Sequence, residues 1–210
     1  MSMMLLMAIV AAVVLVVILV IVAAGFARRM APARSLERAR GQAEEDILRR
    51  LQSVSSALGG SIVPGPALLT PSGRLALLAT RAPQVAEIDV AKFTVTLASP
   101  HALTLIPVQD AAKALQSKNL RAVQPDDPGV AADYRVLASD EAFGRRVATP
   151  ELVGRLRELD KAVNARSRLQ VAPHGATVLV ERGLERPEDL KAFHDGSASV
   201  IEGFRKLAGG

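Results

Sequence analysis

The sequence predicts an α+β protein: an N-terminal transmembrane helix, a juxtamembrane helix, and then a mainly antiparallel sheet packed with two or three helices. Three features support this. Residues 1–27 contain no ionisable side chain. From about residue 60, short segments that alternate apolar and polar residues are separated by Pro/Gly turns. The C-terminal third carries two helix-length apolar stripes. The expected domains are a transmembrane anchor (1–27), a basic collar with the juxtamembrane helix (28–59) and a soluble α+β domain (60–210).

The anchor prediction rests on length and on the solvation of the backbone. Met4 to Phe26 supplies the roughly 20 apolar residues that cross a bilayer core about 30 Å thick. Backbone groups in hydrocarbon must bond within their own segment, so the stretch is expected to be helical. A cleaved signal peptide is the alternative, with Gly25 and Ala27 as its small residues. The absence of Lys or Arg before the apolar run, and the length of the run, argue against it.

Five arginines follow the apolar run and predict its orientation. Basic residues close to a span are retained on the cytoplasmic side. We therefore expect an inner (plasma) membrane protein of a bacterium, with the N-terminus outside and the C-terminal domain cytoplasmic. The absence of Cys agrees with a reducing compartment but also with a periplasm, so a periplasmic domain stays open. The predicted membrane-surface residues are Arg28, Arg29, Arg34, Arg38 and Arg40.

The net charge of +5 is concentrated beside the anchor. Residues 28–50 hold seven Arg against four acids, which gives +3 and leaves +2 for the rest of the chain. A nucleic-acid binder should show a basic stripe, ideally with aromatic residues for stacking. This chain has no Trp, one Tyr and five Phe. We therefore expect no nucleic-acid partner and assign the collar to topology and to anionic headgroups.

The juxtamembrane segment Ser35–Leu58 is predicted to be a helix. Its apolar residues recur at spacings of three, four or seven, and acid-first pairs such as Glu45/Arg49 stand four apart. Fewer than three clean heptads leave two possibilities, a helix docked on its own domain or a short dimerising coiled coil. Gly59-Gly60 is expected to end the helix.

The middle of the chain is predicted to form strands. Thr70-Pro71-Ser72-Gly73 predicts a hairpin turn between Leu68-Leu69 and 75–78. Residues 88–90 and 93–97 alternate apolar and polar side chains, and Ala91-Lys92 shifts the phase by one, which predicts a bulge or bend. The remaining elements expected here are a strand at 103–108 that Pro107 confines to an edge or an end, a surface loop at 124–129, and a strand at 134–137.

The C-terminal third gives the clearest signals. Ser139 or Asp140 can cap a short helix, and Thr149-Pro150-Glu151 begins a second one with an N-cap, a proline and an acid in order. Pro173-His174-Gly175 predicts a hairpin turn. Pro187 begins the last helix, inside which two glycines seven apart indicate either close backbone packing or a break: Gly196 and Gly203.

Tyr134–Phe143 (YRVLASDEAF) and Thr149–Leu159 (TPELVGRLREL) together resemble bacterial single-pass membrane-anchored proteins of unknown function with a C-terminal α+β domain. In those proteins a strand ending in an acidic pair leads to a Thr-Pro-Glu-Leu or Ser-Pro-Glu-Leu helix, then to a hairpin and a terminal helix. Phe93–Leu97 and Pro100–Leu105 fit the same order, so the resemblance covers about Ser61–Leu207. It implies an anchored cytoplasmic domain and brings no known activity.

Three histidines are the first candidates for chemistry. His174 is assigned to its hairpin turn, and His194 is expected to be a solvated or boundary residue of the last helix. His101 has no partner nearby in sequence. No two histidines stand at ligand spacing and the chain has no Cys, so we expect no metal site and no cofactor.

The acidic pairs have simple explanations. Asp126-Asp127 lacks a calcium-loop pattern and is expected in a solvated loop. Asp140-Glu141 suits the start of a helix. Gly-x-Ser-x-Gly, a phosphate-binding Gly-rich loop and His-Glu-x-x-His are absent from the sequence. We therefore expect no catalytic, cofactor-binding or metal residues, and a protein that is not an enzyme.

The sequence thus favours a single-pass membrane-anchored protein with a cytoplasmic interaction or assembly domain. Its expected partners are the lipid bilayer and either another protein or further copies of the chain. Two alternatives stay open: an enzyme whose site is assembled from distant residues, and a domain that binds an anionic lipid surface. The lipid alternative would use the collar and basic residues such as Arg145, Arg146, Arg155 and Arg157. Partner, pathway, oligomeric state and substrate are not specified by the sequence.

Overall fold

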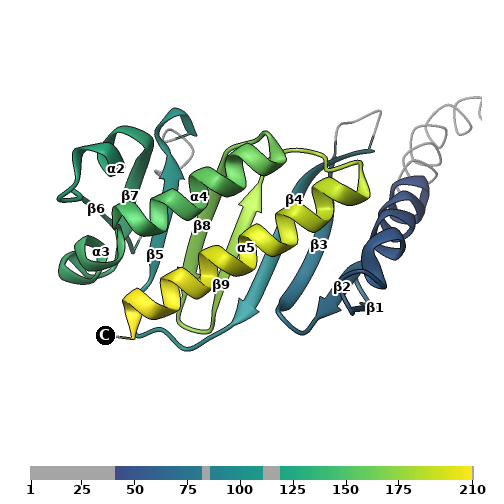
Figure 1. Cartoon of the computed structure of the whole chain (residues 1–210), viewed down its shortest axis with the longest axis horizontal. Coiled ribbons are helices and arrows are strands. Elements are labelled where there is room, and N and C mark those ends of the chain that lie inside the picture. Colours follow the sequence, from purple (N-terminus) through teal and green to yellow (C-terminus); the bar gives the residue numbers. More distant parts are fainter. Residues whose placement is uncertain (1–40, 82–85, 111–118, 210) are drawn as a thin grey trace, which may run out of the picture. The chain divides into compact units, whose positions relative to one another are not determined.

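The structure, a computed structural model, describes residues 41–81, 86–110 and 119–209 (Figure 1). Ala43–Thr80 and Glu87–Gly210 form one compact unit, and Met1–Gln42 with Arg81–Ala86 form another that falls mostly outside the described residues. The predicted anchor and collar also lie outside them. Within the described ranges, no helix is both long enough and apolar enough to span a bilayer.

An antiparallel sheet is the centre of the fold, as the sequence predicts. The described residues contribute nine strands in the order β1-β2-β3-β4-β9-β8-β5-β7-β6. The pairings β1–β2, β2–β3, β4–β9, β8–β9, β5–β8, β5–β7 and β6–β7 are antiparallel. The strands are β1 (Ser61–Val63), β2 (Ala67–Thr70), β3 (Gly73–Arg81), β4 (Ala86–Thr96), β5 (Leu103–Pro107), β6 (Arg121–Val123), β7 (Tyr134–Ala138), β8 (Ser167–Ala172) and β9 (Gly175–Val180).

Two long helices cover one face of this sheet, α4 (Pro150–Val163) and α5 (Pro187–Ala208) (Figure 1). The predicted start of α4 is confirmed, because Thr149 Oγ1 accepts a hydrogen bond from the Leu152 N–H at 3.4 Å. Two short helices flank β7: α2 (Pro128–Asp133) and α3 (Glu141–Val147). Asp140 caps α3, since its Oδ1 accepts from the Phe143 N–H at 2.7 Å.

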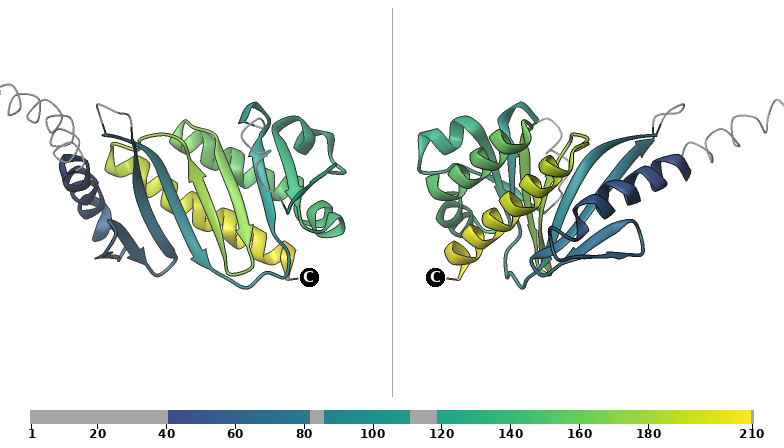
Figure 2. Two further views of the ribbon diagram at one scale, coloured as in Figure 1. Left: turned by 180° about the vertical axis from the view of Figure 1, so that it is seen from behind. Right: turned by 45° about the vertical axis from the view of Figure 1, so that its right-hand side comes forward.

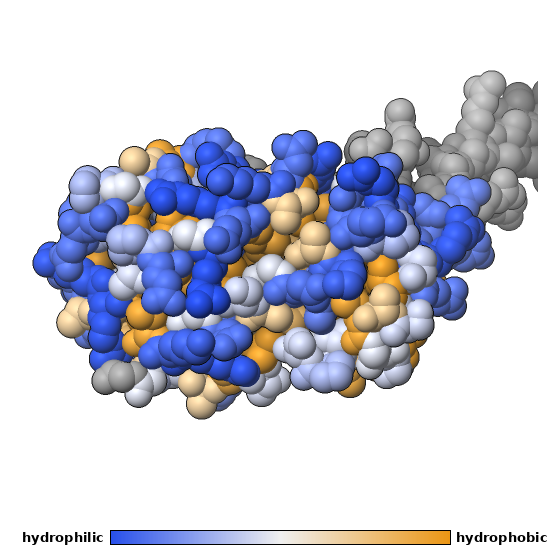
Figure 3. All heavy atoms as spheres, in the orientation of Figure 1, coloured by the Kyte–Doolittle hydropathy of each residue, from blue (hydrophilic) through white to orange (hydrophobic). Residues whose placement is uncertain are grey.

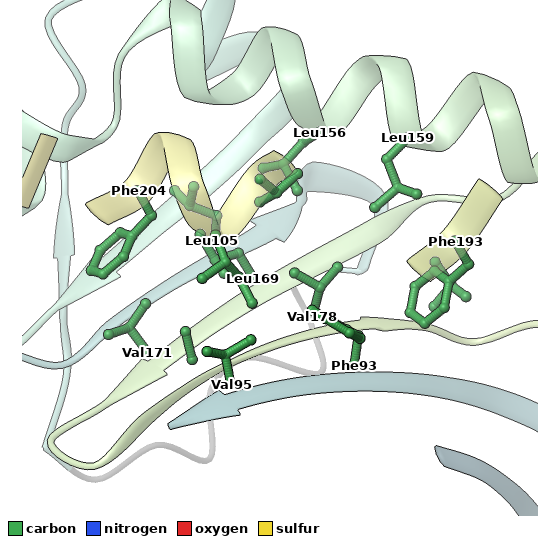
Figure 4. Close-up of a cluster of buried hydrophobic side chains, with 14 of the residues drawn as sticks. Phe93, Val95, Leu105, Leu156, Leu159, Leu169, Val171, Val178, Phe193 and Phe204 are labelled. Atoms are coloured by element: carbon green, nitrogen blue, oxygen red, sulfur yellow. The ribbon is translucent and has the colours of Figure 1, made fainter. Parts of the chain in front are cut away.

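The hydrophobic core lies between the sheet and helices α4 and α5 (Figure 4). Each central strand sends alternate side chains into it, as Phe93 of β4, Leu169 of β8 and Val178 of β9 show; all three are fully buried. Phe193 and Phe204 of α5 meet them from the helix side. Each such side chain contributes about 1.5–3 kcal/mol on burial, so this layer is the main source of stability.

The helix that the sequence predicts at Ser35–Leu58 is docked on its own domain. Residues 41–55 are helical, and Ile47, Leu51 and Val54 are buried in the same core as Leu68 and Leu75. The apolar stripe that could have formed a coiled coil is therefore already covered. Of the two possibilities left open by the sequence, the structure shows the docked helix. The turn after it ends at Gly59, whose φ of 60° suits glycine.

Helices α4 and α5 pack closely because two glycines of α5 face α4. A Cβ at Gly196 would lie 2.8 Å from Leu159 Cδ1, and one at Gly203 would lie 2.7 Å from Arg155 Cδ. Helix α5 runs unbroken through both positions. The glycines therefore mark close packing, which was one of the two predicted explanations.

Two local predictions are wrong. The segment 124–129 is not entirely loop, because Asp127 Oδ1 accepts from the Val130 N–H at 2.9 Å and starts α2. The predicted bulge at Ala91-Lys92 is absent from the described pairing: residues 91–96 of β4 pair with β9 without a gap. Ala91 takes the core position and the apolar Val90 lies on the other side. A small buried alanine, which the pattern did not count as apolar, produced the error.

Candidate functional site

Most of the residues considered as candidates for catalysis or metal binding serve the fold instead. His174 is exposed in the β8–β9 turn, as predicted. The His101 ring packs on Phe143, with ring centroids 4.9 Å apart, and Asp140 caps α3. In the ranges that the structure covers, no group of three or more His, Cys, Asp or Glu is placed to hold a metal ion.

His194 is not the solvated or boundary residue that the sequence predicted. It is 5% exposed, its Nε2 lies 2.9 Å from Thr70 Oγ1, and its Nδ1 lies 2.8 Å from Asp195 Oδ1. The Phe93 ring meets the imidazole edge-on at 5.1 Å. A hydroxyl, an imidazole and a carboxylate in this order superficially match the arrangement of a hydrolase triad.

The burial of Thr70 and His194 indicates that the Thr70–His194–Asp195 group has a structural rather than a catalytic role. Thr70 is 7% exposed, and its hydroxyl also bonds the carbonyl and the N–H of Gly73, at 2.9 and 3.2 Å. Neither the hydroxyl nor the imidazole therefore faces a substrate. Partial burial opposes ionisation of Asp195, but hydrogen bonds from Lys191 and His194 outweigh it and hold the pKa of Asp195 below its ordinary value. The group fastens α5 to the β2–β3 turn.

A second buried network surrounds Asp160 in the last turn of α4. Its Oδ1 accepts from the Ser167 N–H at 2.7 Å and from Ser167 Oγ at 2.6 Å. Its Oδ2 accepts from Tyr134 Oη at 3.0 Å and from Arg166 Nη1 at 3.3 Å. Both carboxylate oxygens are thus fully used, and the network joins α4 to β7 and β8. No acceptor capacity is left over for acid–base chemistry.

Tyr134 is expected to ionise only when the domain unfolds. Burial, and then the neighbouring Asp160 carboxylate, raise the pKa of Tyr134 well above its ordinary value of 10.0. A raised pKa means that the folded state holds the proton more tightly. The stabilisation is complete below pH 10 and is lost as the pH rises above it.

Because Tyr134 is the one Tyr in a chain without Trp, tyrosinate absorbance reports this residue alone. A pH titration of that absorbance and of circular dichroism should show one coincident transition above pH 10. Ionisation at the ordinary pKa in a folded protein would contradict the network.

The basic residues named for the lipid alternative are mostly engaged. Arg155 bonds Ser199 Oγ at 2.9 Å, and Arg157 bonds Asp133 at 2.6 Å. Arg145 bonds Glu141 at 2.7 Å, while Arg146 lies over the Phe143 ring. The helix side mixes hydrophilic residues with smaller apolar areas (Figure 3). These four arginines do not form a free basic surface.

The opposite face of the sheet is the candidate functional surface. No helix among the described residues lies over β4, β9 and β8 on that side (Figure 2, left). We call this the open face; it is formed by the side chains that alternate with the core residues. One row of partners crosses six strands on it: Thr94, Thr177, Gln170, Thr104, Leu137 and Ala122. Thr104 is buried and the others are partly or fully exposed. Beside them lie Lys92, Leu179, Arg168 and Arg135, and toward one end lie Leu69, Arg74 and Leu78.

A hollow of about 490 Å³ lies where the open face reaches α2. Arg135, Gln124 and Val108 are among its lining residues, with Ala122 from β6 and Ala131 from α2. A second hollow, of about 500 Å³, lies outside the Asp160 network, where Asp133 and Asp160 are already bonded to arginines. The first hollow extends the open face, and the second contains groups with a structural role.

Sequence reasoning missed the open face for a definite reason. Its residues come from eight strands between positions 69 and 179, and their common side follows from strand order rather than from local pattern. Alternation did indicate that Thr94 points away from a core, but it did not assign Lys92 and Gln170 to the same face. It gave no means of placing them together with Arg135.

No family model matches the chain, and no curated protein matches its sequence. Among solved structures, the crystal structure of the mycobacterial trehalose monomycolate transport factor A, TtfA, is similar. The sequence identity is 12%, the alignment covers 77% of this chain and 93% of that chain, and the TM-score is 0.47. At this level of similarity we draw nothing from it about function.

Proposed function

We propose that the chain is a single-pass membrane-anchored protein whose cytoplasmic domain has no catalytic role and binds a protein partner or further copies of itself. One observation carries the proposal. An uncharged segment of 27 residues is followed by a short basic stretch and then by a helix that is an integral part of the domain core. A chain built in this way holds a folded domain next to a bilayer.

The docked helix narrows how the domain can assemble. Ile47, Leu51 and Val54 are buried in their own domain, so a coiled coil through this stripe would first require the helix to detach. Binding must therefore use another surface. Among the described residues, the buried His194 and Asp160 networks most resemble catalytic groups. In both, the side chains are occupied by contacts that hold a helix to the sheet. This supports a binding role over an enzymatic one.

Deleting residues 1–27 is expected to convert the protein from membrane-bound to soluble. The full chain should stay in the membrane pellet after alkaline carbonate and leave it in mild detergent, because about 20 apolar residues span the core.

Cross-linking followed by purification from detergent should then recover a discrete partner or a homo-oligomer. A protease applied to spheroplasts should spare the C-terminal domain, as the basic collar requires. Full release of the intact chain by carbonate would refute the anchor.

A further inference from the structure

The exposed large hydrophobic residues of the described chain lie on the open face or line the hollow that extends it. Leu69 is 50% exposed, and Leu78 and Val108 are each 47% exposed. Leu69 pairs with Arg74 on the side of the sheet away from the core. Val108 lines the same hollow as Arg135 and Ala122. The helix side has no comparable exposed side chain among the described residues.

The charged side chains described on the open face are mostly cations. Lys92 and Arg135 make no hydrogen bond or ion pair in the described part of the chain, and Arg74 bonds only backbone carbonyls. Arg168 bonds Glu181 at 3.3 Å. Several helix-side cations, by contrast, are paired with carboxylates, as Lys191 is with Asp195 and Lys206 with Glu202. The open face is therefore basic with exposed aliphatic side chains, a combination suited to a lipid–water interface.

The connection to the predicted anchor keeps the domain near such an interface. Residues 28–42 separate the apolar segment from the compact unit, and a stretch of that length spans at most about 50 Å when fully extended. The bilayer is thus the one anionic surface that the chain itself keeps within reach. The cytoplasmic leaflet carries a negative surface potential that attracts Lys and Arg close to it.

We infer that the open face lies against the anionic phospholipid headgroups of the membrane that holds the anchor, with Lys92 and Arg135 as its principal contacts. This rests on the proposed function. Leu69, Leu78 and Val108 enter the headgroup region, and helices α4 and α5 face the cytoplasm. An acidic protein on the open face is the competing occupant. The lipid surface is favoured because it needs no component beyond the anchored chain and its bilayer.

The absence of cysteine from the chain makes a direct test possible. Full-length protein with Leu78→Cys, carrying a fluorophore, is placed in nanodiscs that contain phosphatidylglycerol and a headgroup-spin-labelled lipid as quencher. Glu202→Cys on α5, whose side chain is 63% exposed, is the matched reporter on the helix side. We expect quenching at position 78 and little at position 202. The difference should disappear in 1 M salt or in phosphatidylcholine alone, because salt at that concentration screens charges beyond about 3 Å.

The double variant Lys92→Glu/Arg135→Glu should reduce the ratio of docked to undocked domain by at least about twentyfold, since each cation near the surface is worth about fivefold. Arg145→Glu/Lys206→Glu is the matched control with the same change in net charge and should have little effect. Equal quenching at both reporters in inserted protein overturns the lipid surface and leaves the anchor intact. If the reporter at position 78 is shielded only when an acidic protein is added, the lipid surface is overturned as well. Failure to insert overturns both proposals.

Discussion

Replacing Asp160 by alanine is expected to lower the free energy of unfolding by about 3–5 kcal/mol, because it breaks a buried charged network. The Tyr134 hydroxyl and the Ser167 N–H would lose their acceptor in a place that water does not reach; both residues are at most 1% exposed. A domain of this size has about 5–15 kcal/mol in total. Urea denaturation of the chain lacking residues 1–27, followed by circular dichroism, measures the loss.

Two further variants make the Asp160 experiment specific. Asp160→Asn keeps the volume and one carbonyl acceptor, so it should fall between wild type and alanine. Glu158→Ala removes an exposed acid from the same helix and should change stability by no more than about 0.5 kcal/mol. If Asp160→Ala proved as mild as Glu158→Ala, the network would not hold α4 to the sheet.

The features predicted best from the sequence are those set by local chemistry. The Thr149 cap, the Pro71-Ser72 turn and the Pro173-His174 turn all have the predicted role, because each depends on a few adjacent residues. Pro107 does end β5, although that strand is central, between β8 and β7. A proline at the last residue of a strand removes no hydrogen bond from its middle, so local reasoning covers this case too.

The features that sequence could not predict depend on strand order. Asp160 reads as an ordinary helix acid until β7 and β8 bring Tyr134 and Ser167 to it. His194 looked solvent-facing because its partner Thr70 lies far away in the chain, at the β2–β3 turn. The same holds for the open face, whose cations are spread over strands that meet only in the folded sheet. Long-range pairing therefore decides which polar residues are structural and which are free to bind.

Replacing Gly196 by valine is expected to cost about 2–3 kcal/mol of stability. The new Cβ would lie 2.8 Å from Leu159 Cδ1, and Leu159 is 1% exposed, so the leucine has nowhere to move without disturbing the core. Valine also extends two methyl groups toward α4. The better helix propensity of valine offsets only a few tenths of a kcal/mol. Urea denaturation of the chain lacking residues 1–27 gives the difference directly.

Gly154→Ala on α4 is the control, and it is expected to raise the stability rather than lower it. A Cβ at that position meets no atom within 4 Å, so alanine reduces the entropy of the unfolded chain without a clash and should stabilise by about 0.5–1 kcal/mol. Helices α4 and α5 pack against each other. If any added side chain in this layer lowered the stability, both Gly196→Val and Gly154→Ala would be destabilising. Opposite signs would show that the contact between Gly196 and Leu159, rather than helix propensity, explains the glycine in α5. A stable Gly196→Val would show that α4 can move away from α5 without loss.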